Sequence, residues 1–134
     1  MSFVLDPRLA ADSVPVLDGP LCSVRLINDA RYPWCLLIPR LPDLREIHQL
    51  AEARQQQLWR ESSQLGAAMM RSFDGHKLNV AALGNVVPQL HVHHIVRFEG
   101  DDAWPAPVWG RHPARPYDDA ALQQRLAVLR AALD

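Results

Sequence analysis

The sequence predicts an α+β fold, with a five-stranded antiparallel sheet, one long helix and a C-terminal helix. Three observations support this fold class. Short apolar runs open the chain, an amphipathic stripe extends over residues 44–73, and a strand-like alternation follows at residues 89–98. With 134 residues, 49% hydrophobic and 22% charged, the chain has the size and composition of a single globular domain.

The first three strands are predicted from apolar runs that turn residues separate. Residues 13–17 indicate an edge strand, because Pro15 lacks the amide hydrogen that a central strand needs. A glycine–proline turn leads to residues 21–27, the second strand of a hairpin. The nearly continuous apolar run at residues 34–39 predicts a buried central strand. Before the hairpin, residues 2–11 are expected to form a short turn or helical cap.

The long helix is predicted from one apolar stripe. Apolar side chains recur at three-, four- and seven-residue spacings from Leu44 to Phe73. Asp43 is the expected N-cap, and Asp74-Gly75 is the expected end. Glu61 is expected on the solvated side of this helix.

The second half of the chain supplies the remaining elements. Residues 77–82 and 89–98 predict the fourth and fifth strands, and a loop containing glycine joins them. A proline-rich, aromatic segment follows, and residues 118–133 predict a second amphipathic helix. The tryptophans are expected mainly to pack; they are Trp34, Trp59, Trp104 and Trp109.

Composition and charge exclude several classes of partner. The net charge of −1 provides no basic footprint for nucleic acid or a membrane surface. No stretch approaches the roughly 18 consecutive apolar residues of a membrane span, and no signal peptide is visible. Cys22 and Cys35 lie in apolar runs, as buried thiols in a reducing compartment do. We therefore expect a cytoplasmic protein.

The most informative segment is the strand that carries three of the six histidines. Gln89, His91 and His93 alternate with apolar residues, so their side chains share one face of a strand. Two adjacent imidazoles that titrate near neutral pH can act as nucleophile, proton shuttle or metal ligands. His94 points to the other face and is expected to be a satisfied core or interface histidine. Arg97 is expected to be exposed at the strand end.

The histidines also allow other interpretations. His48 and His76 are expected on the surface. A zinc site is the alternative outside any family resemblance, since His91 and His93 supply two of the three or four ligands that zinc needs. The sequence offers no obvious third ligand, so we predict no metal site.

The run from Gln89 to Ile95 resembles the histidine triad (HIT) motif, His-φ-His-φ-His-φ-φ with φ apolar, of nucleotide hydrolases and transferases. Gln89 stands where the family has its first histidine. Ile38-Pro39-Arg40 is similar to the family's φ-Pro-Lys/Arg, and the order of strands and helices agrees. The resemblance implies a HIT-like domain over residues 1–110, with residues 111–134 as a helical extension packed on it.

The resemblance implies a role for each residue of the motif. His91 would attack the α-phosphorus of a nucleotide and form a nucleotidyl-imidazole, which splits one hard displacement into two easier steps. The backbone carbonyl of Gln89 would hold the proton on the other ring nitrogen, and His93 would donate to a phosphate oxygen. Asn85 takes the place of the family's phosphate-contacting glutamine, and Gly84 allows the backbone to approach the phosphates.

Two further positions complete the expected site. Asn28 or Asp29 lies where the family often contacts the ribose. Val86 replaces a serine or threonine that is often credited with assisting the leaving group, and valine cannot donate a hydrogen bond.

We therefore expect a hydrolase or nucleotidyl transferase for dinucleoside polyphosphates, such as diadenosine tetraphosphate, or for nucleoside phosphoramidates. No cofactor is required for the covalent step, although Mg²⁺ can accompany a polyphosphate. The resemblance also implies a homodimer whose two sheets join. The alternative, which Gln89 and Val86 motivate, is a non-catalytic nucleotide-binding regulatory protein on the same fold.

Overall fold

Five antiparallel strands form one sheet in the order β1-β2-β3-β5-β4. The computed structural model describes residues 2–134, so Met1 of the expected domain lies outside the described residues. The strands are β1 (Ser13–Asp18), β2 (Cys22–Ile27), β3 (Trp34–Pro39), β4 (Lys77–Ala81) and β5 (Val92–Arg97). The helices are α1 (Pro7–Asp12), α2 (Glu52–Phe73) and α3 (Asp119–Leu133), with a short 3-10 turn, η1, at Ile47–Gln49. The α+β class predicted from the sequence is confirmed.

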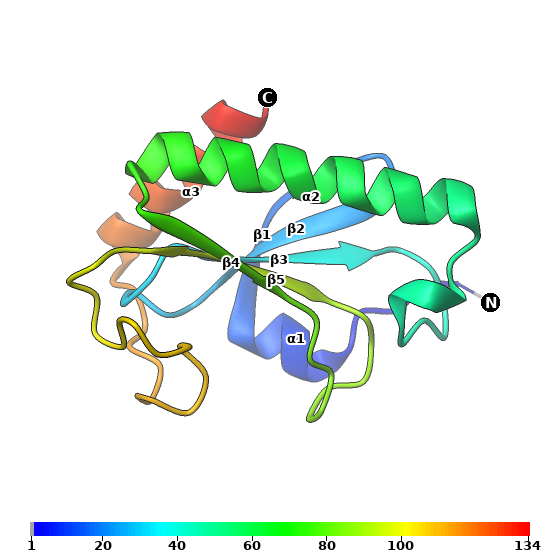
Figure 1. The fold of residues 1–134 in the computed structure, drawn as a ribbon, viewed down its shortest axis with the longest axis horizontal. Helices are drawn as coiled ribbons and strands as arrows, with labels where there is room; N and C mark the ends of the chain where they lie inside the picture. The colour runs from blue at the N-terminus through cyan, green and yellow to red at the C-terminus, as the bar shows by residue number, and fades with distance from the viewer. Residues whose placement is uncertain (1) are drawn as a thin grey trace.

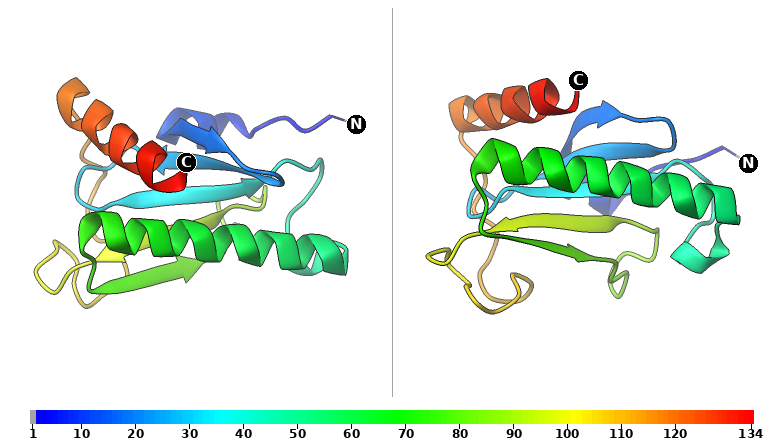
Figure 2. Two further views of the ribbon diagram at one scale, coloured as in Figure 1. Left: turned by 90° about the horizontal axis from the view of Figure 1, so that it is seen from above. Right: turned by 45° about the horizontal axis from the view of Figure 1, so that its top comes forward.

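The helices cover the two faces of the sheet unequally. The long α2 and the C-terminal α3 lie on one face, and the short α1 lies against the other (Figure 1; Figure 2). The main core fills the space between the sheet and the two longer helices. Two smaller apolar clusters occupy the α1 face, one around Leu9 and one around Ile95. Because both faces are covered, every residue of β5 is buried.

The strand predictions agree with the structure, with one exception at β5. Pro15 lies in β1, an edge strand, where its missing amide hydrogen costs no sheet bond. The strand with the histidines begins at Val92 rather than at Gln89. The reason is that the amide of Leu90 donates to the carbonyl of Leu44, outside the sheet. Gln89 and His91 therefore precede the strand.

The predicted start of the long helix at Leu44 was wrong. Asp43 is not an N-cap, since it has a φ of +56°, in the left-handed region. After η1, α2 begins only at Glu52. Leu44 is buried in the main core although it is not helical, so its apolar spacing reflects packing of a loop. The predicted end is correct, with Asp74 in the left-handed conformation after Phe73.

Two charged side chains that were expected at the surface are buried. Glu61 accepts hydrogen bonds from the backbone amides of Leu21 and Cys22 and from Gln57. Arg97 is only 1% exposed, and its Nε lies 2.8 Å from a carboxylate oxygen of Asp101. Both are tolerated in the interior because their charges are hydrogen-bonded or paired.

Two exposed histidines and two buried cysteines agree with the sequence predictions. His48 and His76 are exposed, and Cys22 and Cys35 are free and buried, as predicted. Within residues 2–134, no helix has both the length and the apolar character needed to cross a membrane.

Candidate active site

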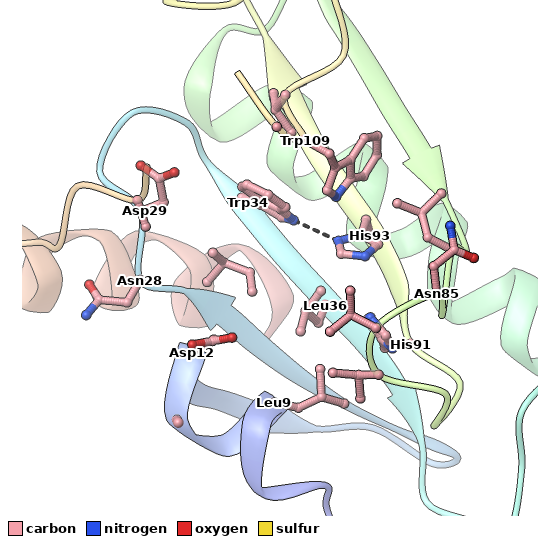
Figure 3. Close-up of a pocket in the computed structure, with 18 of the residues that line it drawn as sticks. Leu9, Asp12, Asn28, Asp29, Trp34, Leu36, Asn85, His91, His93 and Trp109 are labelled. Carbon is pink, nitrogen blue, oxygen red and sulfur yellow. Dashed lines mark hydrogen bonds between the residues drawn. The ribbon is translucent and has the colours of Figure 1, made fainter. Parts of the chain in front are cut away.

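A cavity of about 670 Å³ lies on the α1 face of the sheet (Figure 3). Side chains from α1, β2, β3 and the start of β5 line it, together with the loop after β4 and the segment before α3. Six of the residues selected from the sequence line this cavity: Asn28, Asp29, Gly84, Asn85, His91 and His93. The seventh, Gln89, does not line it.

His91 is held through one of its two ring nitrogens. Its Nδ1 lies 2.6 Å from the carbonyl oxygen of Gln89. A carbonyl oxygen only accepts hydrogen bonds, so Nδ1 carries a proton, and in the neutral ring the lone pair is then on Nε2. His91 is 7% exposed, and that remaining surface belongs to the cavity. This neutral tautomer presents one nitrogen with nucleophilic character.

His93 is held in the opposite tautomer. The indole Nε1–H of Trp34 donates to Nδ1 of His93 at 3.0 Å, so the ring proton of His93 is on Nε2 (Figure 3). Burial, and then the neighbouring His91 and His94, lower the pKa of His93 to about 3. His93 is therefore neutral near pH 7 and presents an N–H donor. The centroids of the His91 and His93 rings are 5.0 Å apart.

The loop between β4 and β5 forms another side of the cavity. Gly84 has a φ of +73°, a conformation that glycine adopts without strain. Asn85 and Val86 follow and are exposed, and both line the cavity. The loop therefore places a side-chain amide, but no hydroxyl, beside the histidines.

The fold agrees with the comparisons to known proteins. The family model of the HIT domain matches residues 8–100. The chain belongs to the histidine triad family. This family comprises nucleotide-binding hydrolases and transferases. A comparison with curated proteins gave no significant match.

Three solved histidine triad proteins are similar over almost their whole length. The protein from Bradyrhizobium japonicum is 45% identical, with a TM-score of 0.98 and complete coverage of both chains. The protein from Marinobacter aquaeolei VT8 is 50% identical, with a TM-score of 0.97 over 99% of this chain and 97% of the other. The protein from Sinorhizobium meliloti 1021 is 40% identical, with a TM-score of 0.95 over 98% and 97%.

At the end of the cavity away from His91, Asn28 and Asp29 make local contacts in this histidine triad protein (Figure 3). The side-chain oxygen of Asn28 accepts from the amide of Tyr117 at 2.9 Å. One oxygen of Asp29 accepts from the amides of Arg31 and Arg115. Both residues thus join the loop after β2 to the segment that leads into α3, and their contact with a ribose stays a prediction.

Several cavity residues were not identified from the sequence. Leu9 and Asp12 come from α1, and nothing in their local pattern connects them to the histidines. Trp34 and Trp109 were expected to pack, and they do pack on His93, but they also line the cavity. In the part of the chain that the structure describes, no group of three His, Cys, Asp or Glu side chains is placed to hold a metal ion.

Proposed function

We propose that this histidine triad protein is a nucleotide hydrolase or nucleotidyl transferase that works through a covalent intermediate on His91. The observation that carries the proposal is the 2.6 Å contact between Nδ1 of His91 and the carbonyl of Gln89. It places the lone pair of the neutral ring on Nε2, and it stabilises the positive charge that the ring acquires when Nε2 bonds to phosphorus. Gln89 thus takes the place of the first histidine through its backbone, which a glutamine supplies as well as a histidine.

The reaction has two balanced displacements. Nε2 of His91 attacks the α-phosphorus, and the bond from phosphorus to the leaving group breaks with its electron pair on the leaving group, which takes a proton from solvent. Water or another acceptor then attacks the same phosphorus. The phosphorus–nitrogen bond breaks, the acceptor loses its proton to solvent, and His91 returns to its neutral form.

His93 and Asn85 stabilise the phosphate in this scheme. The ring of His93 is neutral near pH 7, because its pKa is about 3, and its one N–H group is on Nε2. This N–H can donate a hydrogen bond to a phosphate oxygen. The side-chain amide of Asn85 lies on the same cavity and adds a second donor. A hydrogen-bond donor that points at the charge developing in the transition state lowers the activation free energy by up to about 3 kcal/mol in a buried site.

The charges around the cavity favour a substrate with little negative charge. Among the lining residues within 2–134 there is no lysine and no arginine, whereas Asp12 and Asp29 are carboxylates. A nucleoside phosphoramidate carries one negative charge at its phosphorus, so it enters without a cationic partner. A dinucleoside polyphosphate carries several, and we expect it to need Mg²⁺ for charge neutralisation.

Mass spectrometry of the protein after brief exposure to substrate tests the proposal. Adenosine phosphoramidate and diadenosine tetraphosphate, the latter with and without Mg²⁺, are supplied separately at neutral pH. We expect one AMP group, labile in acid and stable in base, on His91, and more of it from the phosphoramidate. His91→Asn should abolish the adduct, and the exposed His76→Asn should retain it.

The contrary result has a definite meaning. Saturable nucleotide binding without adduct or product would overturn the enzyme and favour the nucleotide-binding regulatory protein. The specific observation behind that second candidate is Val86. It is 77% exposed at the cavity and offers no hydroxyl to a leaving group.

A further inference from the structure

The side chain of Gln89 makes two hydrogen bonds to the N-terminal segment. Its Oε1 accepts from the backbone amide of Asp6 at 2.9 Å, and its Nε2 donates to the carbonyl of Val4 at 2.9 Å. The carbonyl of residue i and the amide of residue i+2 point to the same side of an extended chain, as in a strand that awaits a partner. The primary amide of glutamine supplies the matching acceptor and donor on one planar group.

One of these bonds reaches the residue at which α1 begins. Asp6, whose amide Gln89 binds, is also the N-cap of α1, and its carboxylate accepts from the amide of Arg8 at 2.8 Å. The guanidinium of Arg8 donates to the carbonyl of Val86 at 2.9 Å. The first turn of α1 is therefore tied twice to residues 86–89. Val4 is 76% exposed, so side-chain burial does little to hold it in place.

The other end of α1 is fixed by the sheet. Asp12 is followed at once by β1, and the hydroxyl of Ser13 donates to the carbonyl of Leu9. One end of the helix is thus built into the sheet. The other is held by the hydrogen bonds of Gln89 and Arg8, together with the packing of Phe3 and Leu5 against the cluster around Leu9. The helix between them carries Leu9, Ala11 and Asp12, which line the cavity opposite His93 (Figure 3).

We propose that Gln89 is a positioning residue that acts through α1. Its side-chain amide holds residues 4–6 against the histidine segment and thereby sets the wall of the cavity that Leu9 and Asp12 form. The backbone carbonyl of Gln89 accepts the hydrogen bond that orients His91, whereas its side chain affects substrate affinity through the position of α1. The inference rests on the proposed function only for its kinetic readout, because the position of the wall can be measured without turnover.

The sharpest test is Gln89→Glu, which keeps the shape and the backbone carbonyl but replaces the donor to Val4 with a charged oxygen that the Val4 carbonyl repels. Gln56→Glu, on the exposed side of α2, makes the same chemical change away from the cavity and is the matched control. For the Gln89 variant we expect amide exchange at Asp6 and Arg8 to accelerate about tenfold, the effect of losing one hydrogen bond. We expect its Kd for AMP and its KM to rise by a similar factor.

Arg8→Ala removes the second tie from an exposed position, and it should raise the Kd for AMP in the same direction even if Gln89→Glu folds poorly. Unchanged amide exchange in both variants would show that Gln89 and Arg8 do not hold residues 4–6 in place. Faster exchange with unchanged AMP affinity would overturn the role of α1 as a wall, and a fall in kcat alone would place Gln89 in the chemistry. A wild-type protein that binds AMP but forms no adduct would overturn the proposed reaction, while exchange and affinity would still decide the role of Gln89.

Discussion

Trp34 determines which nitrogen of His93 carries the proton. An indole N–H only donates, so the nitrogen that it meets at 3.0 Å must be the unprotonated one. Burial lowers the pKa of His93 to about 3, so a second proton is not gained near neutral pH. Together these two effects keep Nε2 as an N–H donor. Trp34 is thus a positioning residue for the proposed phosphate contact.

Replacing Trp34 with Phe should release this tautomer while it retains an aromatic ring against His93. We expect kcat to fall about five- to tenfold, equivalent to one neutral hydrogen bond of about 1 kcal/mol. Nitrogen-15 NMR of the histidine side chains should show His93 changing from a single tautomer to a mixture. A structural role alone would not move this spectrum.

Trp109→Phe is the matched control. Trp109 also packs on His93, with ring centroids 5.1 Å apart, but it makes no hydrogen bond to it in the described structure. Its replacement should leave the His93 tautomer unchanged. If Trp34→Phe also leaves it unchanged, the indole does not set the tautomer.

At this scale the sequence predicted the histidines, and the family resemblance predicted the Gln89 carbonyl as the partner of His91, but neither predicted the partner of His93. His91 and His93 follow from a period of two within six residues, which is local information. Trp34 lies 59 residues before His93, and the Gln89 side chain reaches 83 residues back to Asp6. Such contacts depend on which strands become neighbours in the sheet. β3 and β5 are adjacent there, although α2 and β4 lie between them in the sequence.

At the scale of elements, α2 shows what apolar spacing can and cannot predict. Leu58, Leu65 and Met69 do form a buried stripe on one helix. Leu44 continues the same spacing into a loop that packs in the same core, so the pattern placed the helix start too early. Apolar spacing reports burial, whereas a helix start depends on caps and backbone angles such as the positive φ of Asp43.

Glu61 shows a second limit, because a buried charge has no apolar signature. Its carboxylate accepts from the amide of Cys22 at 3.0 Å and joins α2 to the turn between β1 and β2. A Cβ on Gly19 would lie 2.5 Å from the same carboxylate, so a side chain there would have to displace Glu61 from its position.

Glu61→Ala should therefore destabilise the fold by about 2–3 kcal/mol, since it leaves two buried backbone amides without an acceptor. Urea unfolding followed by circular dichroism measures the loss. Glu52→Ala, an exposed residue of the same helix, is the control and should change stability by less than about 0.5 kcal/mol. An equal effect of the two substitutions would mean that Glu61 does not anchor the turn.

For the whole molecule, β5 connects the candidate site to stability through two histidines on opposite faces. His93 faces the cavity, and His94 faces α2, where its Nε2 lies 2.7 Å from the hydroxyl of Ser62. Burial lowers the pKa of His93 to about 3 and that of His94 to about 4, from an ordinary value of 6.5. Both rings are neutral in the folded protein at pH 7 and both resist protonation there.

The fold should therefore lose stability in mild acid. A histidine whose pKa is lowered on folding takes up its proton more readily in the unfolded chain. The free energy of unfolding has its full value above pH 6.5, where both states are neutral. It decreases as the pH falls from 6.5 towards 4, because only the unfolded chain takes up the proton in this range. For His94 the full effect is on the order of 3 kcal/mol. Urea unfolding at half-unit steps from pH 7.5 to 4.5 should show this decline.

A double variant separates the contribution of His94. His94→Leu with Ser62→Ala removes the imidazole and the hydroxyl that pairs with it, so no buried polar side chain is left without its partner. Its stability should decline less steeply between pH 6.5 and 4.5, and the remaining slope should reflect His93. The exposed His76→Asn should keep the wild-type slope. A double variant as steep as wild type would mean that His94 does not contribute to the acid sensitivity.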